Sequence, residues 1–376
     1  MEMILRAIFY IGALILFYTY ILYPIVLMIL SPEQAETKPT VRNSDAWPSV
    51  SVIIAAYNEE EAIASRIRNF LTTRYAGSIE LLIVSDASTD RTDEIVKGYE
   101  SDKVRLIVQQ RRQGKGAAIN RAVPEARGDI LAFTDASSVF LPETVSELVK
   151  PFCNPTVGLV NGKIHYRDTE IGNLYHRYER LLKSVEVRGG IVASVHGAVY
   201  AMRKSIWERH DPRFVNDLYD PIVTRLKGFS VAIASDALCM ESFSKGTQFR
   251  RQVRMVALAA LVLFRLTPRI VEAREWRLLL VLMSHKLLRW MTAVWLLLVV
   301  TATICLASAG PVFSVAATLE AFVGFLALAG LISECFGLSE RIAFIYNFIV
   351  LNLAAMVGLW ICIRGKAVAT WQPNAS

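Results

Sequence analysis

The sequence is poor in cysteine and has no C-x-x-C pair. Its five cysteines are an odd number, and three of them fall in apolar segments. This pattern gives no basis for a secreted-type disulfide framework. We expect reduced cysteines that serve in packing, in a protein whose soluble part faces the cytosol. They are Cys153, Cys239, Cys305, Cys335 and Cys362.

Basic tails and helices of the kind that bind nucleic acid are also missing. The formal net charge is +7, from 41 Lys and Arg against 34 Asp and Glu, but no Lys/Arg-rich tail carries it. We therefore expect no nucleic acid partner. The positive balance instead suits contact with anionic membrane lipids and the binding of phosphorylated ligands.

Charge is scarce at both ends of the chain and concentrates between about residues 31 and 290. The 376 residues are 53% hydrophobic with a mean hydropathy of +0.37, which is too apolar for two ordinary soluble domains. Part of the chain therefore belongs in lipid. A multi-pass protein of the cytoplasmic membrane, with a cytosolic polar middle, is the expected arrangement.

The N-terminal apolar stretch, Ile4 to Leu30, exceeds the roughly 20 residues that a membrane span needs. A cleaved signal peptide is the alternative, but no small-residue cleavage site precedes Ser31. We expect a transmembrane anchor over residues 1–31. Three more spans are expected in a region over 287–363, followed by a tail over 364–376. They are Leu287–Ala307, Val312–Ile332 and Ile342–Ile363.

Between the polar middle and these spans lies an amphipathic region over 246–286. Thr247 to Leu266 is basic at its start and then apolar, which predicts a helix in the plane of the lipid headgroups. A buried amphipathic helix of the soluble domain is the alternative. Glu320, inside an apolar stretch, is expected to face another helix or a polar cavity.

The polar middle, residues 48–245, alternates strand and helix patterns. It begins with Val50 to Ala56, a β-branched run typical of a strand that is buried on both faces. The alternation predicts a doubly wound α/β sheet that binds ligands at the carboxyl ends of its strands. The elements that follow are helix Glu60–Thr73, strand Ile79–Ser85, helix Arg91–Gly98, strand Val104–Val108, helix Lys115–Ala122 and strand Asp129–Phe133.

Polar side chains follow the first two strands. Tyr57 and Glu59 come directly after the first strand, although carboxylates at a helix start are favoured by the helix dipole in any case. Asp86 and Asp90 lie in the hydroxyl-rich turn after the second. We expect Asp86 to bind ligand and Asp90 to cap the next helix.

Three further groups carry charge that suits phosphate chemistry. Lys115 stands between two glycines at a helix start, where a cation and free N–H groups can meet phosphate, although the spacing is not that of a P-loop. Asp135 follows a strand, and a divalent cation that bridges phosphates takes one or two such carboxylates. Arg250, Arg251 and Arg254 suit either lipid headgroups or a diphosphate.

Two more carboxylates, Asp217 and Asp220, lie roughly eighty residues downstream of Asp135. Removal of a proton from an acceptor hydroxyl needs a base of this type.

The order of these motifs resembles the family 2 glycosyltransferases of the GT-A fold, relatives of the cellulose, chitin and hyaluronan synthases. The resemblance covers about Val50 to Arg254, through YNEE, VSDASTD, GKGAAINRA, GDILAFTDAS, NDLYD and RRQVR, and SHKLLRW near the C-terminal spans adds to it. It implies a Rossmann-like mixed sheet flanked by transmembrane helices, and a hexosyltransferase-type enzyme.

For the donor, the resemblance implies a nucleotide sugar, with UDP the commoner carrier among relatives. It assigns the nucleobase to Asp86, the nucleoside to Tyr57 and Glu59, and the phosphates to Lys115.

For the reaction, the resemblance places Mg²⁺ or Mn²⁺ at Asp135, the first acid of the family's D-x-D motif, and the catalytic base at Asp217. Inversion at the anomeric carbon follows. Arg251 and Arg254 are expected to hold the diphosphate leaving group, and a shifted register leaves Asp220 as an alternative base.

The sequence departs from the family pattern at four positions: Ser137 and Asn216 replace acids, Arg251 replaces a Gln and Met255 replaces a Trp. The missing Gln and Trp weaken the case for a processive synthase. We expect a lipid-linked acceptor first and a polysaccharide acceptor second, the latter with assembly partners. A processive synthase subunit and a non-catalytic scaffold with a degenerate transferase fold remain the alternatives.

Overall fold

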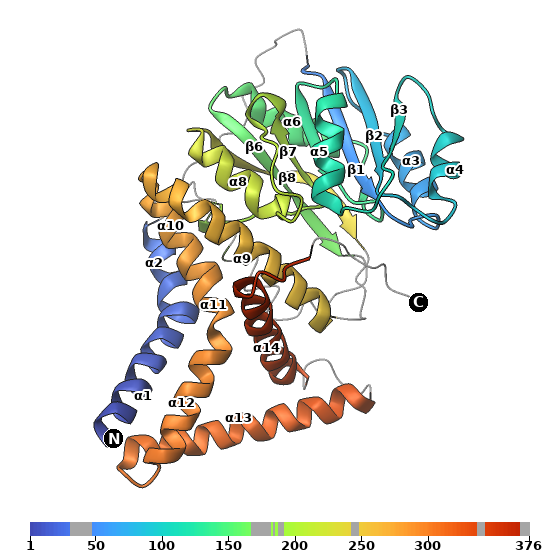
Figure 1. Ribbon diagram of the computed structural model, residues 1–376. Helices are drawn as coiled ribbons and strands as arrows, with labels where there is room; N and C mark the ends of the chain where they lie inside the picture. Colours follow the sequence, from blue (N-terminus) through green and yellow to red (C-terminus); the bar gives the residue numbers. More distant parts are fainter. Residues whose placement is uncertain are drawn as a thin grey trace.

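In the computed structural model, an α/β domain stands on a group of apolar helices (Figure 1). The structure describes residues 1–30, 47–166, 182, 185–186, 192–241, 248–336 and 343–368. The N-terminus lies at the end of the helical group that is remote from the α/β domain.

The described strands form one mixed eight-stranded sheet in the order β3-β2-β1-β4-β7-β6-β8-β5. The first four in this order are mutually parallel, β7 runs antiparallel to both β4 and β6, and β8 is parallel to β6. The carboxyl ends of β1 to β4 therefore meet at one edge. The bounds are β1 Val50–Ala56, β2 Ile79–Ser85, β3 Val104–Val108, β4 Ile130–Thr134, β5 Val139–Phe140, β6 Val157–Tyr166, β7 Tyr200–Arg203 and β8 Ser230–Glu241.

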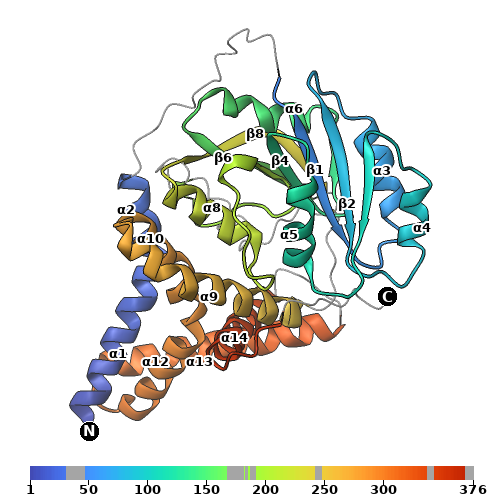
Figure 2. The ribbon, with the colours of Figure 1, turned by 45° about the horizontal axis from the view of Figure 1, so that its top comes forward.

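Both faces of the sheet are covered, as the continuous apolar character of β1 predicts. Val52 and Ile54 face a core shared with α3 and α6, whereas Ile53 faces a second core shared with α5. The two layers can be followed in Figure 2. The helices of this domain are α3 Ile63–Leu71, α4 Thr92–Lys97, α5 Lys115–Glu125, α6 Thr144–Val149 and α8 Asn216–Leu226, with 3-10 turns at Lys150–Cys153 and Lys204–Ile206.

The loop that is predicted to bind phosphate contains one close backbone approach, at Gly116. A Cβ at Gly116 in α5 would lie 2.4 Å from the carbonyl oxygen of Pro212. We expect Gly116→Ala to lower the free energy of unfolding by about 1–3 kcal/mol. The reason is that the added methyl group would clash with the Pro212 backbone, which cannot move aside as a flexible side chain can. Thermal unfolding in detergent measures this. Gly324→Ala, where a Cβ meets nothing within 4 Å, is the control, and an unchanged melting temperature in Gly116→Ala would contradict the expectation.

In the described residues, three helical segments are long and apolar enough to cross a membrane, or four if one bent pair counts as a span. The N-terminal one, Glu2–Ile29, consists of α1 Glu2–Phe17, a π-helical turn Tyr18–Leu22 and α2 Tyr23–Leu30. The others are α13 Pro311–Phe336 and α14 Phe344–Ile363.

The stretch predicted as one membrane span over Leu287–Ala307 is bent in the structure. The chain here forms α10 Trp276–Leu282, a π-helical turn Met283–Leu287, α11 Leu288–Trp290 and, after a 57° bend, α12 Thr292–Leu306. The bend follows Met291, and π-helical turns often mark functional sites. Composition is apolar on both sides of the bend, so hydropathy alone does not reveal it.

Helix α9, Gln248–Glu272, crosses between the α/β domain and the apolar helices (Figure 1). Its apolar face, which includes Val256, Ala260 and Leu263, is buried against α8, α10 and α14. Arg251 and Arg265 are exposed. The helix is therefore amphipathic as predicted, and its buried face packs on α8 of the α/β domain and on α10 and α14 of the apolar group. Its position in the plane of the lipid headgroups stays a prediction.

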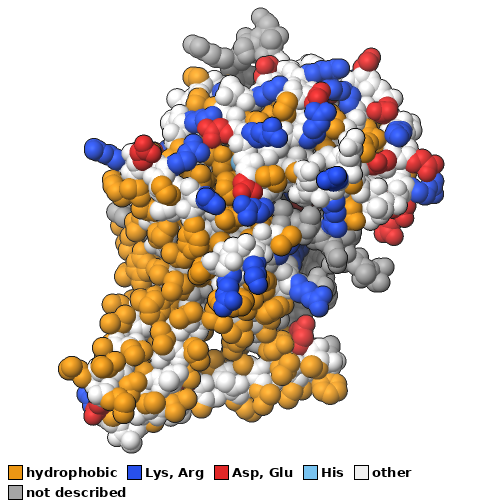
Figure 3. All heavy atoms as spheres, in the orientation of Figure 1, with side chains coloured by type: hydrophobic (Ala, Val, Ile, Leu, Met, Phe, Trp, Pro, Cys, Tyr) orange, Lys and Arg blue, Asp and Glu red, His pale blue; other side chains and the backbone are white. Residues whose placement is uncertain are grey.

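Figure 3 shows hydrophobic side chains over the helical group and Lys, Arg, Asp and Glu side chains over the α/β domain, with several cations at the boundary. Within the apolar part, Glu320 accepts a hydrogen bond from the Thr303 hydroxyl at 3.0 Å. The expectation that Glu320 faces another helix is confirmed.

Candidate active site

The loops after β1 and β2 are joined into one rim. Asn58, with φ +53°, accepts a hydrogen bond from the Thr89 N–H at 2.8 Å. The Asp90 carboxylate accepts hydrogen bonds from the Glu60 N–H at 3.1 Å and from the Thr92 N–H, at the start of α4, at 3.0 Å. The N-cap residue of α4 is Arg91 and not the predicted Asp90, but the Asp90 side chain binds the first N–H of the helix and joins it to the neighbouring loop.

Asp86 joins the loop between β3 and α5 to this rim. Its side chain is buried, and its two oxygens accept hydrogen bonds from the N–H groups of Gln113 at 2.8 Å and Gly114 at 2.7 Å. Gly114 has φ +94°, a conformation that favours glycine. Asp86 thus sets the position of Lys115, the next residue. Contact between Asp86 and a nucleobase remains a prediction.

Lys115 and Asp135 lie together at the carboxyl edge of the sheet. The Lys115 ammonium donates a hydrogen bond to Asp135 Oδ1 at 2.5 Å, and the two side chains are 43% and 41% exposed. Burial lowers the pKa of Lys115, but the negative charge of Asp135 outweighs it, so the net shift is upward. The pair places a fixed cation beside an accessible carboxylate, which suits an anionic diphosphate and its counter-ion.

Two further carboxyl groups lie near Asp135. Burial, followed by the charges of Asp135 and Asp90, raises the pKa of Glu59 to about 7. Burial and then Asp135 also raise the pKa of Glu241, and its Oε1 accepts a hydrogen bond from the Ser138 hydroxyl at 3.1 Å. Sequence reasoning missed Glu241, although it ends strand β8 as Asp135 follows β4.

The residues around Asp135 fit a divalent cation that is shared with a substrate. No group of three or more His, Cys, Asp or Glu in the described part of the chain forms a metal cage. Magnesium, however, typically takes only one or two protein carboxylates and completes its shell with phosphate oxygens and water. Asp135 supplies such a carboxylate, and the nearby Glu59 and Glu241 lower the local potential.

The two candidate bases have different surroundings. Asp217 lines a cavity, and its charge contributes to the raised pKa of Lys115. Asp220 is 1% exposed, and its Oδ2 accepts a hydrogen bond from the Tyr200 hydroxyl at 2.7 Å. Burial raises the pKa of Asp220 to about 7. Of the two candidate bases, Asp217 is therefore the one that lines the cavity, and its role as base stays a prediction.

The buried Asp220 has a consequence for stability. Because its folded pKa exceeds the unfolded value near 3.8, the folded state binds more protons between about pH 4 and pH 7. The stability contribution is present at low pH and is lost as pH rises through about 7. We expect Asp220→Asn to reduce the fall in melting temperature between pH 5 and pH 7. Scans of the wild type and of Asp220→Asn test this, and equal slopes would contradict it.

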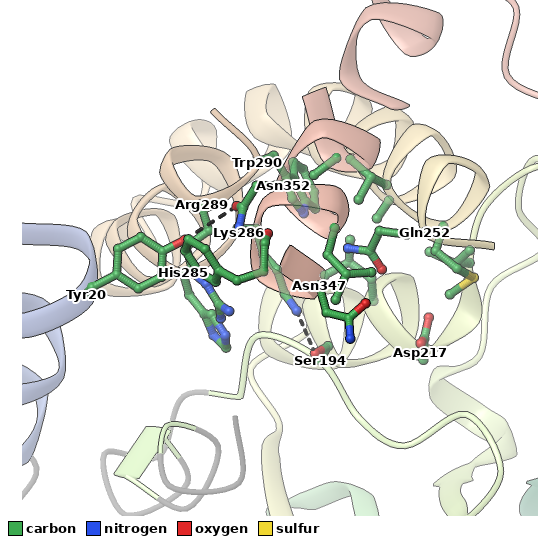
Figure 4. Close-up of a pocket in the computed structure, with 18 of the residues that line it drawn as sticks. Tyr20, Ser194, Asp217, Gln252, His285, Lys286, Arg289, Trp290, Asn347 and Asn352 are labelled. Atoms are coloured by element: carbon green, nitrogen blue, oxygen red, sulfur yellow. Dashed lines mark hydrogen bonds between the residues drawn. The ribbon is translucent and has the colours of Figure 1, made fainter. Parts of the chain in front are cut away.

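The cavity beside Asp217 has a volume of about 230 Å³. Its walls come from α8, α9, α11 and α14, from the π-helical turn Met283–Leu287, and from Tyr20. In the view of Figure 4, Asp217, Gln252, Asn347 and Ser194 lie toward one end of the cavity and Tyr20 and His285 toward the other. Its polar lining residues are Tyr20, Ser194, Asp217, Gln252, His285, Lys286, Arg289, Asn347 and Asn352.

The remaining predicted residues border this region. The Arg112 guanidinium stacks 3.6 Å from the ring centroid of Tyr57. On α9, the Arg251 charge acts on Glu241, and burial lowers the pKa of Arg254, as does the neighbouring Arg251. The structure thus brings Asp135 within electrostatic reach of Glu59 and Lys115, and Lys115 within electrostatic reach of Asp217.

Residues 51–235 match the family model described as glycosyl transferase family 2. A β-monoglucosyldiacylglycerol synthase from Nostoc sp. is 35% identical over 118 residues, covering 30% of this chain and 25% of the relative. A poly-β-1,6-N-acetyl-D-glucosamine synthase from Staphylococcus aureus is 26% identical over 176 residues, covering 45% of this chain and 42% of the relative. The chain therefore aligns with less than half the length of these relatives.

Among solved structures, a mannosyltransferase from Pyrobaculum calidifontis in complex with GDP-Man and Mn²⁺ superposes with a TM-score of 0.73 and 22% identity. The match covers 96% of this chain and 99% of that one. It therefore extends from the sheet through the apolar helices. The predicted GT-A fold, a mixed α/β sheet with flanking apolar helices, is confirmed.

Proposed function

Because its residues 51–235 belong to glycosyl transferase family 2, we propose that this chain is an inverting glycosyltransferase that moves a sugar from a nucleoside diphosphate to a lipid-linked acceptor at the cytoplasmic face of a membrane. The observation that carries the proposal is the position of Asp217. It lines a cavity walled partly by apolar helices, and it lies within electrostatic reach of Lys115.

The donor occupies the carboxyl edge of the parallel strands. Asp86, Tyr57 and Glu59 bind its base and nucleoside, and Lys115 binds its phosphates. The nucleotide carrier is UDP or GDP: uridine is common in the family, and the Pyrobaculum protein was solved with GDP-Man.

Asp135 would hold Mg²⁺ or Mn²⁺ together with the donor phosphates. A cation bound there would supply positive charge against the negative charge of the leaving diphosphate. Arg251 and Arg254, on α9, add positive charge for the same leaving group.

In the reaction, Asp217 accepts the proton of the acceptor hydroxyl. The hydroxyl oxygen bonds to the anomeric carbon as the bond from that carbon to the diphosphate oxygen breaks, so the configuration inverts. The nucleoside diphosphate leaves with the bonding electron pair. Asp220 is a positioning residue, because its contact with Tyr200 packs α8 against the sheet.

A lipid-linked acceptor is supported by the apolar helices that wall the cavity and by the Nostoc relative, whose name denotes a glycolipid synthase. The Staphylococcus relative supports a second candidate, polysaccharide synthesis with assembly partners. Met255 lines the cavity where the family's Trp would receive a growing chain, which favours the lipid-linked acceptor.

The test is release of nucleoside diphosphate by the purified protein in detergent, with a panel of UDP- and GDP-sugars, Mn²⁺ or Mg²⁺, and membrane lipid extract as acceptor. We expect metal-dependent release with one donor. Absence of release with every donor would contradict the proposal in favour of a non-catalytic scaffold.

A further inference from the structure

The cavity beside Asp217 contains cations that the donor chemistry does not use. Lys286 belongs to the π-helical turn Met283–Leu287, and Arg289 belongs to α11. Neither Lys115 nor Asp135 lines this cavity, and the donor phosphates are proposed to lie on those two residues. Lys286 and Arg289 therefore lie apart from the proposed site of the donor phosphates. We infer that they bind a phosphate group of the acceptor lipid, an inference that rests on the proposed function.

The surroundings of Lys286 leave its charge available to a ligand. Its Nζ donates a hydrogen bond to the neutral Ser194 hydroxyl at 3.1 Å. Among the described residues, no carboxylate lies within 4.0 Å of the Lys286 ammonium. An ammonium in a partly desolvated site gains most from an anion, and a phosphate oxygen is a strong hydrogen-bond acceptor.

Arg289 adds a second positive charge from one turn further along. Its side chain is 8% exposed, and its guanidinium lies 6.0 Å from the ring centroid of Tyr20. Arg and Lys together suit a phosphate, because the planar guanidinium gives two parallel donors and the ammonium a compact charge. The bend at Met291 turns the segment that carries Lys286 and Arg289 away from the direction of α12. Both side chains line the cavity.

The rest of the lining suits a lipid rather than a free anion. Val256 and Ala259 on α9, and Phe348, Leu351 and Ala355 on α14, form an apolar wall. The volume of about 230 Å³ is below the roughly 300–1,000 Å³ of ordinary small-molecule pockets. It holds one headgroup, with the hydrocarbon continuing along the helices. In that position the phosphate lies near Lys286 and Arg289, and the accepting hydroxyl lies near Asp217.

Binding in detergent micelles tests the inference without turnover. Isothermal titration would compare dioctanoyl phosphatidic acid, dioctanoylglycerol and inorganic phosphate as probes. We expect phosphatidic acid to bind at least tenfold more tightly than either of the others. Lys286→Gln should remove at least tenfold of that affinity, and Lys286→Arg should retain most of it.

Arg277→Gln is the matched control, because it removes one exposed cation from α10 outside the cavity lining. An equal loss in Arg277→Gln would overturn the inference, since it would indicate general attraction to the micelle. Equal binding of phosphatidic acid and dioctanoylglycerol, or of inorganic phosphate and phosphatidic acid, would overturn it as well. Failure of the proposed function would be seen in a different experiment, as the absence of nucleoside diphosphate release in the turnover assay.

If Lys286→Gln unfolds at a lower temperature than the wild type, Arg289→Lys gives a second measurement. It keeps the charge and removes the planar fork, so we expect a smaller loss of phosphatidic acid affinity than in Lys286→Gln. Full wild-type affinity in both variants would overturn the inference.

Discussion

Asp217→Asn is expected to lower kcat for sugar transfer by about 10²–10⁴-fold, the usual contribution of a general base. The amide keeps the shape of the side chain but cannot accept the proton of the acceptor hydroxyl. Donor affinity is expected to stay near the wild-type value, because the donor residues lie on other loops. Release of nucleoside diphosphate under single-turnover conditions and nucleotide binding by titration separate the two effects.

The matched control is Asp102→Asn, an exposed carboxylate before β3 at the opposite edge of the sheet from the site. It is expected to leave kcat unchanged. Asp220→Asn decides between the two candidate bases. Because Asp220 is buried and its amide can still accept from Tyr200, we expect a smaller loss than in Asp217→Asn. A larger loss in Asp220→Asn would transfer the role of base to Asp220.

The parallel half of the fold could be predicted from the sequence because its signal is local. The predicted bounds of β1, β2 and β3 agree with the structure. For β1 and β2 the reason is that an apolar run buried on both faces ends where polar residues begin. The helix predicted over Glu60–Thr73 is shorter, Ile63–Leu71. Its first residues instead form the loop that donates to Asp90.

The antiparallel half and the cavity could not be predicted in the same way. They depend on contacts between segments far apart in the chain, such as His285 on the π-helical turn and the buried Glu186, which are hydrogen-bonded. The Tyr23 hydroxyl, from α2, also donates to Glu186 at 3.3 Å. No spacing pattern relates these three residues, so their convergence is a tertiary feature.

Glu241 is a further residue of the site that could not be predicted from the sequence. Its place at the end of a strand is similar to that of Asp135, but β8 has a mixed burial pattern, and its pairing with β6 contains two register shifts. Without a continuous apolar run, the strand and therefore its end are not evident from sequence. The charges around Asp135 are thus more numerous than the predicted motifs indicate.

These charges lead to the second large effect. Asp135→Ala is expected to reduce metal-dependent turnover by at least about 10²–10³-fold, the size of effect seen when one preorganised electrostatic group is removed. The carboxylate is the accessible oxygen donor beside Lys115. Its loss removes the proposed metal ligand and also frees the Lys115 ammonium to approach the phosphates directly.

Measurements of Mn²⁺ affinity by electron paramagnetic resonance, with and without nucleoside diphosphate, give a readout that is independent of turnover. Asp129→Ala, at the amino end of the same strand, is the control and is expected to keep wild-type affinity. Because Glu59 and Glu241 lie close to Asp135 and share its electrostatic environment, they are the residues that would hold the metal if Asp135→Ala retained full Mn²⁺ affinity. That result would remove Asp135 from the metal site, whereas loss of affinity only in the presence of nucleotide would place the metal between Asp135 and the donor phosphates.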